Sequence, residues 1–200
     1  MTVIQNFIKE FPLPEQMSSS PWKITKTLSA ILKDLISRLD EHYTISEGVA
    51  VHKSAIIENG VVLKSPIIIS ANCFIGANAY LRDGVYLGES VTIGPGCEIK
   101  TSIISAKTSI AHFNFIGDSI IGANVNFEAG ALTANHHNDK LDKRIYVYHN
   151  AQVIDTGVDK FGSLIGDHSK IGANAVLSPG TILPANSIVG RLELVDQRKK

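Results

Sequence analysis

Three basic residues stand 18 positions apart in the sequence, at Lys64, Arg82 and Lys100. If residues at this interval lie above one another, the three cations repel unless an anion lies across them or their side chains spread into water. Guanidinium and ammonium groups match the oxygens of phosphates and carboxylates, so Arg82 and Lys100 are candidate ligands of an anionic substrate. A solvated charged surface explains the same residues equally well.

A histidine, His112, follows this basic stripe and is a candidate general base. An imidazole with an ordinary pKa of about 6.5 accepts a proton near neutral pH. Glu98 stands two residues before Lys100 and could orient the ring. The alternative interpretation is an ordinary surface histidine.

The interval of 18 has a structural meaning, because aliphatic residues return at every sixth position. The row comprises Ile57, Leu63, Ile69, Ile75, Leu81, Leu87, Ile93 and Ile99. Small or branched residues precede each by two positions, at Ala55, Val61, Ile67, Cys73, Ala79, Val85, Val91 and Cys97. A period of six fits neither an amphipathic helix nor simple strand alternation. We therefore predict an all-β solenoid, a parallel β-helix in which three hexapeptides form one coil, rather than a β-sandwich with coincidental spacing.

Two irregularities interrupt the period and indicate where function sits. The row continues after five-residue steps at Ile104 and at Ile121, so we expect the register to shift around residues 100–121. Between Ala134 and Gly162 the hexads stop, which predicts one long inserted loop with a hairpin over Ile145–Ile154. The hexads return at Ile165 and continue to Val189.

The sequence divides into an N-terminal helical segment (1–45), the β-helix (46–192, with the excursion 134–162) and a polar tail (193–200). A short helix is possible over Val3–Phe11. Ser20 and Pro21 predict the start of an amphipathic helix that ends near His42. We expect this helix to cap the open end of the β-helix, with partner binding as the alternative. The terminal Arg198, Lys199 and Lys200 are interpreted as a solvated end.

Composition limits the classes of partner. The formal net charge is zero, which gives no reason to expect nucleic acid or an anionic membrane. No apolar run is long enough to cross a bilayer, and the first residues lack the pattern of a signal peptide. We therefore expect a cytoplasmic protein without nucleic acid or membrane partners. Cys73 and Cys97 are interpreted as small buried residues rather than a disulfide or metal pair.

The polar residues of the coils carry a family resemblance, from about Ile57 to Val189. The signature runs over His112–Asp118 (HFNFIGD), Asn124–Gly130 (NVNFEAG) and Ala134–Asn135. It resembles the C-terminal acetyltransferase domain of bifunctional sugar-1-phosphate nucleotidylyltransferases and of glucosamine-1-phosphate acetyltransferases. The resemblance implies a left-handed hexapeptide-repeat acyltransferase that works as a homotrimer, with acetyl-CoA between neighbouring subunits. No metal is required, and the nucleotidylyltransferase domain is expected to be absent.

The resemblance also assigns roles to individual residues. His112 is the implied base that deprotonates the sugar amine, supported by Glu98, while Asn126 positions the reacting groups. Ala129 and Ser163 are the implied contacts of the acetyl-CoA. The implied contacts of the sugar phosphate are Arg82, Lys100, Phe115, Asn135, Lys140 and Lys143.

Two departures from the family pattern keep a second hypothesis open. Phe115 stands where the family has a tyrosine, and Glu128 replaces a glycine beside the acetyl site. They favour a non-catalytic trimeric module that binds sugar phosphates, whereas Glu98 and His112 favour the enzyme. A third hypothesis is a γ-class carbonic anhydrase with zinc on His112, His136 and His137, although adjacent histidines lack the expected spacing.

Overall fold

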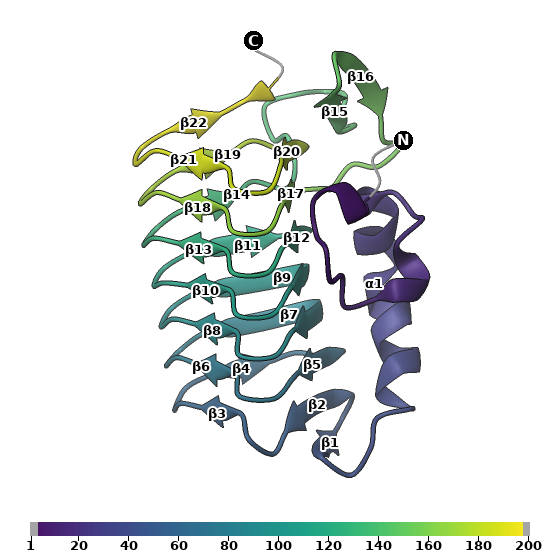
Figure 1. The fold of residues 1–200 in the computed structure, drawn as a ribbon, viewed down its shortest axis with the longest axis vertical. Helices are drawn as coiled ribbons and strands as arrows, with labels where there is room; N and C mark the ends of the chain where they lie inside the picture. The colour runs from purple at the N-terminus through teal and green to yellow at the C-terminus, as the bar shows by residue number, and fades with distance from the viewer. Residues whose placement is uncertain (1–3, 198–200) are drawn as a thin grey trace.

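The computed structural model describes residues 4–197, in which a left-handed parallel β-helix stands beside one α-helix (Figure 1). Each coil contributes one strand to each of three walls, called A, B and C in chain order. Equivalent strands of successive coils pair in parallel, as Ile75 with Ile93 in wall A. The predicted solenoid is confirmed.

The strands are short and follow the hexads. Wall A contains β3 (Ile56–Ile57), β6 (Phe74–Ile75), β8 (Thr92–Ile93), β10 (Ser109–Ile110), β13 (Asn126–Phe127), β18 (Lys170–Ile171) and β21 (Ile188–Val189). Wall B contains β4 (Val62–Leu63), the first halves of β7 (Tyr80–Leu87) and β9 (Glu98–Ile104), β11 (Phe115–Gly117), β14 (Leu132–Thr133), β19 (Val176–Leu177) and β22 (Leu194–Val195). Wall C contains β2 (Val49–His52), β5 (Ile67–Ile69), the second halves of β7 and β9, β12 (Ile120–Ile121), β17 (Ser163–Ile165) and β20 (Thr181–Leu183). The last strand, β22, extends the pairing beyond the predicted boundary at residue 192.

The aliphatic row points into the prism, where successive coils stack on one another. Leu81, Ile93 and Ile99 are fully buried in one continuous cluster. Cys73 and Cys97 are buried in the same cluster as free thiols, as predicted.

The shift of register occurs where it was predicted. Arg82 pairs with Lys100, an interval of 18 residues, but Val85 pairs with Ser102, an interval of 17. The later pair Ile103 and Ile120 keeps the interval of 17. The turn between walls B and C is therefore one residue shorter in β9 than in β7.

The excursion leaves the prism between β14 and β17 and carries the predicted hairpin. Strands β15 (Tyr146–His149) and β16 (Gln152–Asp155) pair antiparallel. The turn residues Asn150 and Ala151 both have positive φ, near 51° and 58°, as in a type I′ turn. Pairing of Ile121 with Ile165 shows that the coil resumes directly after the excursion.

The helix α1 (Pro21–Ile36) lies along wall C and does not cap the end of the prism, which corrects the expectation (Figure 1). Ile57 of the first coil remains 37% exposed at the open end. The helix lies along wall C because a second apolar row points outward from this wall and packs against the helix and the rest of the N-terminal segment. It comprises Ala50, Ile68, Tyr86, Ile103, Ile120, Leu164 and Ile182.

The N-terminal segment contains less helix than expected. Within the predicted helix Val3–Phe11, the structure has only a 3₁₀ turn, η1 (Ile4–Asn6), and Val3 lies outside the described residues. The amide of Lys9 donates to Asp167 Oδ2 at 2.9 Å and so does not serve a helix. After η2 (Pro14–Gln16), α1 ends at Ile36 rather than near His42. Beyond Ile36 the amides of Arg38 and Leu39 bond three residues back, to the carbonyls of Leu35 and Ile36, and Asp40 then forms a turn by accepting the His42 amide.

The remaining features concern the ends of the fold. Strand β1 (Tyr43–Ser46) pairs antiparallel with β2 before the first coil. No helix in residues 4–197 is long and apolar enough to span a membrane. The interpretation of Arg198–Lys200 as a solvated end lies outside the described residues.

Candidate functional site

The predicted basic stripe forms along the turn between walls B and C, which we call edge BC. Pairing of Leu63 with Leu81, and of Arg82 with Lys100, stacks Lys64, Arg82 and Lys100 in one column. The chain itself supplies the anions that such a column needs. Arg82 Nε donates to Glu98 Oε1 at 2.8 Å, and its Nη1 donates to Asp83 Oδ2 at 2.6 Å.

Lys100 is held more firmly than Arg82. Its ammonium group lies 3.0 Å from Asp118 Oδ2, and the two side chains are only 12% and 8% exposed. The same carboxylate oxygen accepts a hydrogen bond from the buried Asn135 amide. Lys100, Asp118 and Asn135 therefore form a closed polar network under the surface.

This network also closes the base of the excursion. The carbonyl of Asp118 accepts the amide of Gly162 at 2.9 Å, and the carbonyl of Asn135 accepts the amide of Phe161 at 2.9 Å. The predicted ligand Asn135 thus ties the departing chain to the returning chain. Phe115 lies beside it, since a methyl group added to Gly117 would lie 2.7 Å from the Phe115 ring and 2.9 Å from Asn135 Nδ2.

The sequence pattern did not predict the acids that pair with this stripe. The register shift places Gly117, 17 residues after Lys100, directly beside it in the next coil. Asp118 reaches Lys100 from the following turn position, so the interval of 18 alone does not predict the pair.

His112 lies on the opposite side of wall B, at the turn between walls A and B, which we call edge AB. Backbone bonds link Phe113 N to Pro95 O at 3.1 Å and Gly130 N to His112 O at 3.0 Å. His112 therefore stands directly between Pro95 of the preceding coil and Ala129 of the following one. Its ring is exposed and meets the Phe113 ring edge-on at 5.9 Å.

The expected contact between Glu98 and His112 is absent within residues 4–197, because Glu98 accepts from Arg82 instead. Glu98 faces outward on wall B, whereas Asn126 is exposed on wall A. In a single chain the other two residues predicted for catalysis, Glu98 and Asn126, thus lie on different walls that meet at the edge of His112.

Edge AB also presents a row of outward backbone amides. The carboxylate of Glu58 caps the Ala77 amide at 2.7 Å, and that of Glu128 caps the Ala173 amide at 2.8 Å. The amide of Ala129 has no such partner among the described residues, because the coil below it carries Ala111 in place of a glutamate. It is a free donor one coil above His112.

The remaining predicted residues lie elsewhere. Ser163 is fully buried in β17, and its hydroxyl has no hydrogen-bond partner among the described residues. Lys143 is exposed and donates to the Asn138 carbonyl at 3.3 Å. Neither residue is brought to edge AB.

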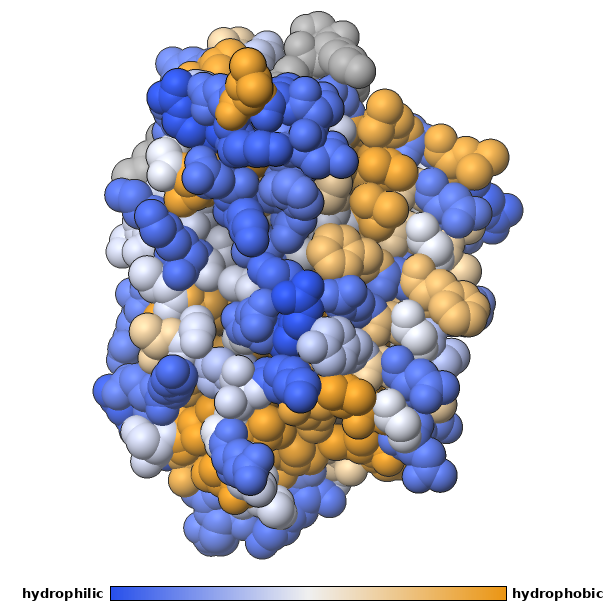
Figure 2. Space-filling model, turned by 180° about the vertical axis from the view of Figure 1, so that it is seen from behind, coloured by the Kyte–Doolittle hydropathy of each residue, from blue (hydrophilic) through white to orange (hydrophobic). Residues whose placement is uncertain are grey.

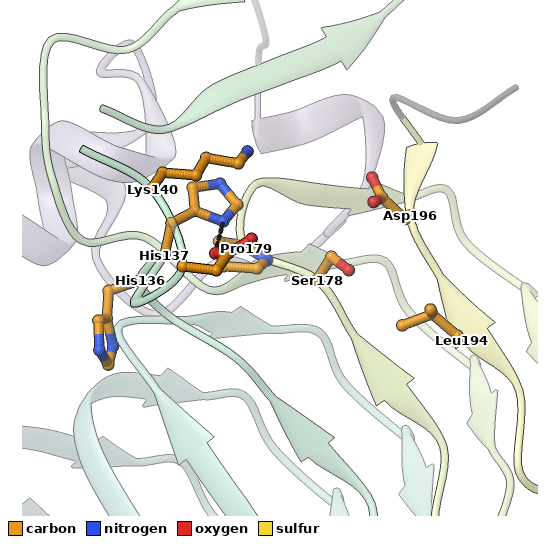
Figure 3. Close-up of a pocket in the computed structure, with 8 residues that line it drawn as sticks. His136, His137, Lys140, Ser178, Pro179, Leu194 and Asp196 are labelled. Atoms are coloured by element: carbon orange, nitrogen blue, oxygen red, sulfur yellow. Dashed lines mark ion pairs between the residues drawn. The ribbon is translucent and has the colours of Figure 1, made fainter. Parts of the chain in front are cut away.

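Lys140 lines a pocket of about 450 Å³ where the excursion begins, beside Ser178 and Asp196 (Figure 3). In that view Lys140 extends over His137, whose ring lies 4.0 Å from Asp139, while His136 points away. Both histidines directly follow Asn135 at edge BC, so they lie across wall B from His112 at edge AB. Residues 4–197 contain no group of three or more histidine, cysteine or acidic side chains arranged to hold a metal.

Comparison with known proteins places the chain among relatives. Residues 63–191 match the family model described as the GMPPB C-terminal domain, which is more than half of the chain. The chain belongs to this family. The chain is 47% identical over 180 residues to a Bifunctional protein GlmU of Methanococcus maripaludis, covering 88% of the chain and 43% of the relative.

A second relative is the bifunctional sugar-1-phosphate nucleotidylyltransferase/acetyltransferase of Sulfurisphaera tokodaii. It is 36% identical over 88 residues, which are 44% of the chain and 21% of the relative. The chain thus spans less than half the length of both curated relatives. The predicted resemblance to hexapeptide-repeat acyltransferase domains is confirmed.

Among solved structures, the polysialic acid O-acetyltransferase OatWY matches with a TM-score of 0.46 and 22% identity, over 73% of this chain and 74% of that one. A point mutant of perosamine N-acetyltransferase from Caulobacter crescentus, solved with CoA and GDP-perosamine, matches with a TM-score of 0.42 and 12% identity, over 72% and 53%.

Proposed function

We propose that the chain is an acetyltransferase that moves an acetyl group from acetyl-CoA to the amine of an amino-sugar phosphate resembling glucosamine 1-phosphate. The exposed His112, one coil below the free Ala129 amide, is the observation that carries the proposal. The names of the bifunctional relatives, which include sugar-1-phosphate nucleotidylyltransferase/acetyltransferase, support it.

In the proposed reaction the acceptor amine attacks the thioester carbonyl carbon of acetyl-CoA. The carbon–nitrogen bond forms, His112 takes the proton of the amine, and the carbon–sulfur bond breaks with the electrons leaving on the thiolate. The thiolate then takes a proton and departs as CoA. The Ala129 amide donates to the carbonyl oxygen while it carries negative charge. No protein thiol takes part, since both cysteines are buried.

To bind the phosphate of the acceptor, a cation must be able to release the carboxylate that it contacts in the free protein. Arg82 meets this requirement better than Lys100, because its side chain is more exposed and its acids, Glu98 and Asp83, are at the surface. We propose Arg82 as the principal phosphate ligand, with Lys140 and Lys143 of the excursion as further contacts. Lys100 then acts by holding Asp118 and Asn135 in place.

The proposed active unit is a homotrimer in which wall A of one copy faces wall B of the next. Wall C is covered by the N-terminal segment, which leaves walls A and B free to associate. Figure 2 shows the molecule from behind, where hydrophobic residues gather at the lower centre and at the upper right and hydrophilic residues lie between them. Such an arrangement would bring Asn126 of one copy to Glu98 of its neighbour. Analytical ultracentrifugation tests the predicted trimer.

A second candidate function is a non-catalytic trimeric module that binds sugar phosphates. Phe115 favours it, since its ring offers no hydroxyl to a substrate.

Release of CoA from acetyl-CoA with a panel of amino-sugar 1-phosphates separates the two functions. A thiol-reactive reagent reports the product, and the buried cysteines of the folded protein give little background. Turnover that is lost in His112→Ala and kept in Lys53→Ala, a surface variant near the open end, supports the enzyme. Binding of sugar phosphates without turnover of any acceptor supports the module.

A further inference from the structure

The glutamate that departs from the family pattern is fully engaged at edge AB. Glu128 Oε1 and Oε2 each accept a hydrogen bond of 2.7 Å from the Arg191 guanidinium. Oε2 also accepts the Ala173 amide at 2.8 Å. These donors lower the pKa of Glu128 to about 2, with the Arg191 hydrogen bonds as the largest cause, so the carboxylate is charged at neutral pH.

The position of this pair relative to His112 is set by the coils. The edge residues His112, Ala129, Ala173 and Arg191 follow one another in successive coils, as the bond from Leu192 N to Ala173 O shows. Three coil spacings of about 4.8 Å separate His112 from Arg191, or about 14 Å. The extended pantetheine arm of an acyl-CoA spans such a length between its thioester and its phosphates.

A pocket of about 400 Å³ lies beside the pair on wall A. Asn126 and Glu128 line its lower part, and Lys170 and Arg191 line it with them. Two cations and one carboxylate leave the pocket with an excess of positive charge. The Arg191 side chain is 74% exposed and that of Glu128 36%, so water and solutes reach the pair.

We propose that Arg191 binds a phosphate group of the acyl donor, and that Glu128 holds Arg191 and the Ala173 amide until this phosphate displaces it. The inference rests on the proposed function. A phosphate offers the guanidinium the same bidentate geometry as a carboxylate and carries more charge. Once Glu128 is displaced, the Ala173 amide is free to donate to a carbonyl of the pantetheine arm.

The exchange gives the glutamate a role in selecting the donor. A thioester that lacks phosphates cannot compete for Arg191 and meets a capped amide at Ala173. A phosphorylated donor releases both groups at once. Surface ion pairs of this kind are weak, so the displacement is within reach of a ligand phosphate.

The test measures binding of CoA and of pantetheine, which lacks the phosphates, by isothermal titration calorimetry. We expect Arg191→Gln to weaken CoA binding about tenfold, the loss of one charge-assisted contact, and to leave pantetheine binding unchanged. Glu128→Gln should strengthen CoA binding severalfold, because it removes the charged competitor. Asp34→Asn is the matched control, since it removes a carboxylate from the exposed Arg38 pair on α1.

The outcomes separate this inference from the proposed function. If wild type binds CoA and both edge variants bind it equally well, or if they change CoA and pantetheine binding alike, the exchange is overturned while the proposed function stands. If wild type binds neither compound, both fail. Thermal unfolding of each variant establishes that it is folded.

Discussion

The buried network at the base of the excursion predicts a large effect of one conservative substitution. Asp118→Asn keeps the size of the side chain, and asparagine tolerates the left-handed backbone that Asp118 adopts at φ 46°. It retains one oxygen that can accept from Asn135, while the other oxygen is replaced by an NH2 donor, so the side chain loses its charge at nearly constant volume. Lys100 is then left as a nearly buried cation without a counterion.

Removing one partner of a buried ion pair costs about 3 kcal/mol of unfolding free energy. For a chain of this size each kcal/mol lowers the melting temperature by about 2–4 °C, which predicts a decrease of about 6–12 °C. Urea unfolding followed by circular dichroism measures the free energy, and thermal unfolding gives the second value.

Asp83→Asn is the matched control, because Asp83 occupies the equivalent turn position with φ 61° and pairs with Arg82. Its side chain is 53% exposed, so we expect a loss of less than about 1 kcal/mol. Equal losses in the two variants would show that burial of the Lys100 pair does not determine its contribution, and the reasoning would be refuted.

Three further predictions concern the edges and the core. The folded-state pKa of Glu128, about 2, lies below its ordinary value of 4.5. The stabilisation by Arg191 is therefore complete above about pH 4.5 and is lost as the pH falls toward 2. In Arg191→Gln, an NMR titration should show the pKa of Glu128 rising toward 4.5. Burial raises the pKa of Cys73 to about 11, so a thiol reagent should modify it only on unfolding, and rapid modification of the native protein would contradict this. Gly84→Ala should cost about 1 kcal/mol more than Gly157→Ala in urea unfolding. Both positions have positive φ, but a methyl group added at Gly84 would lie 3.3 Å from the backbone nitrogen of Ser29 in α1, whereas one added at Gly157 would meet no atom within 4 Å.

The sequence was most informative where the same requirement, burial of an apolar side chain inside the prism, applies to every coil. The inward row from Leu63 to Ile99 must be apolar in each turn, so its period predicts the solenoid and its slips predict the register shift. The position of α1 along wall C was not predicted. Doubled aliphatics recur on that wall, as in Ile103–Ile104 and Ile120–Ile121, but pairs such as Ile56–Ile57 on wall A and Val62–Leu63 on wall B also occur, and their outward members are exposed. A doubled aliphatic alone therefore does not identify the covered wall.

The candidate site was predicted in part. The stack of Arg82 and Lys100 followed from the interval, but their neutralisation by Glu98 and Asp118 did not, because only cations were traced through the coils. The bond between Glu128 and Arg191 spans 63 residues, including the excursion. A pair whose separation depends on the length of an insertion has no periodic signal.

The N-terminal segment laid along wall C bears on how the molecule opens. In a bare solenoid each coil contacts only its neighbours, so coils can detach one at a time from either end. Here the backbone of Phe7 and Lys9 is bonded to Asp167, in a late coil, whereas α1 packs against β5, β7 and β9, in early ones. The N-terminal segment thus connects early and late coils, so the coils at either end cannot unfold separately until this segment has detached. Hydrogen exchange should accordingly find the coils protected as a unit, in place of a gradient that declines toward the ends.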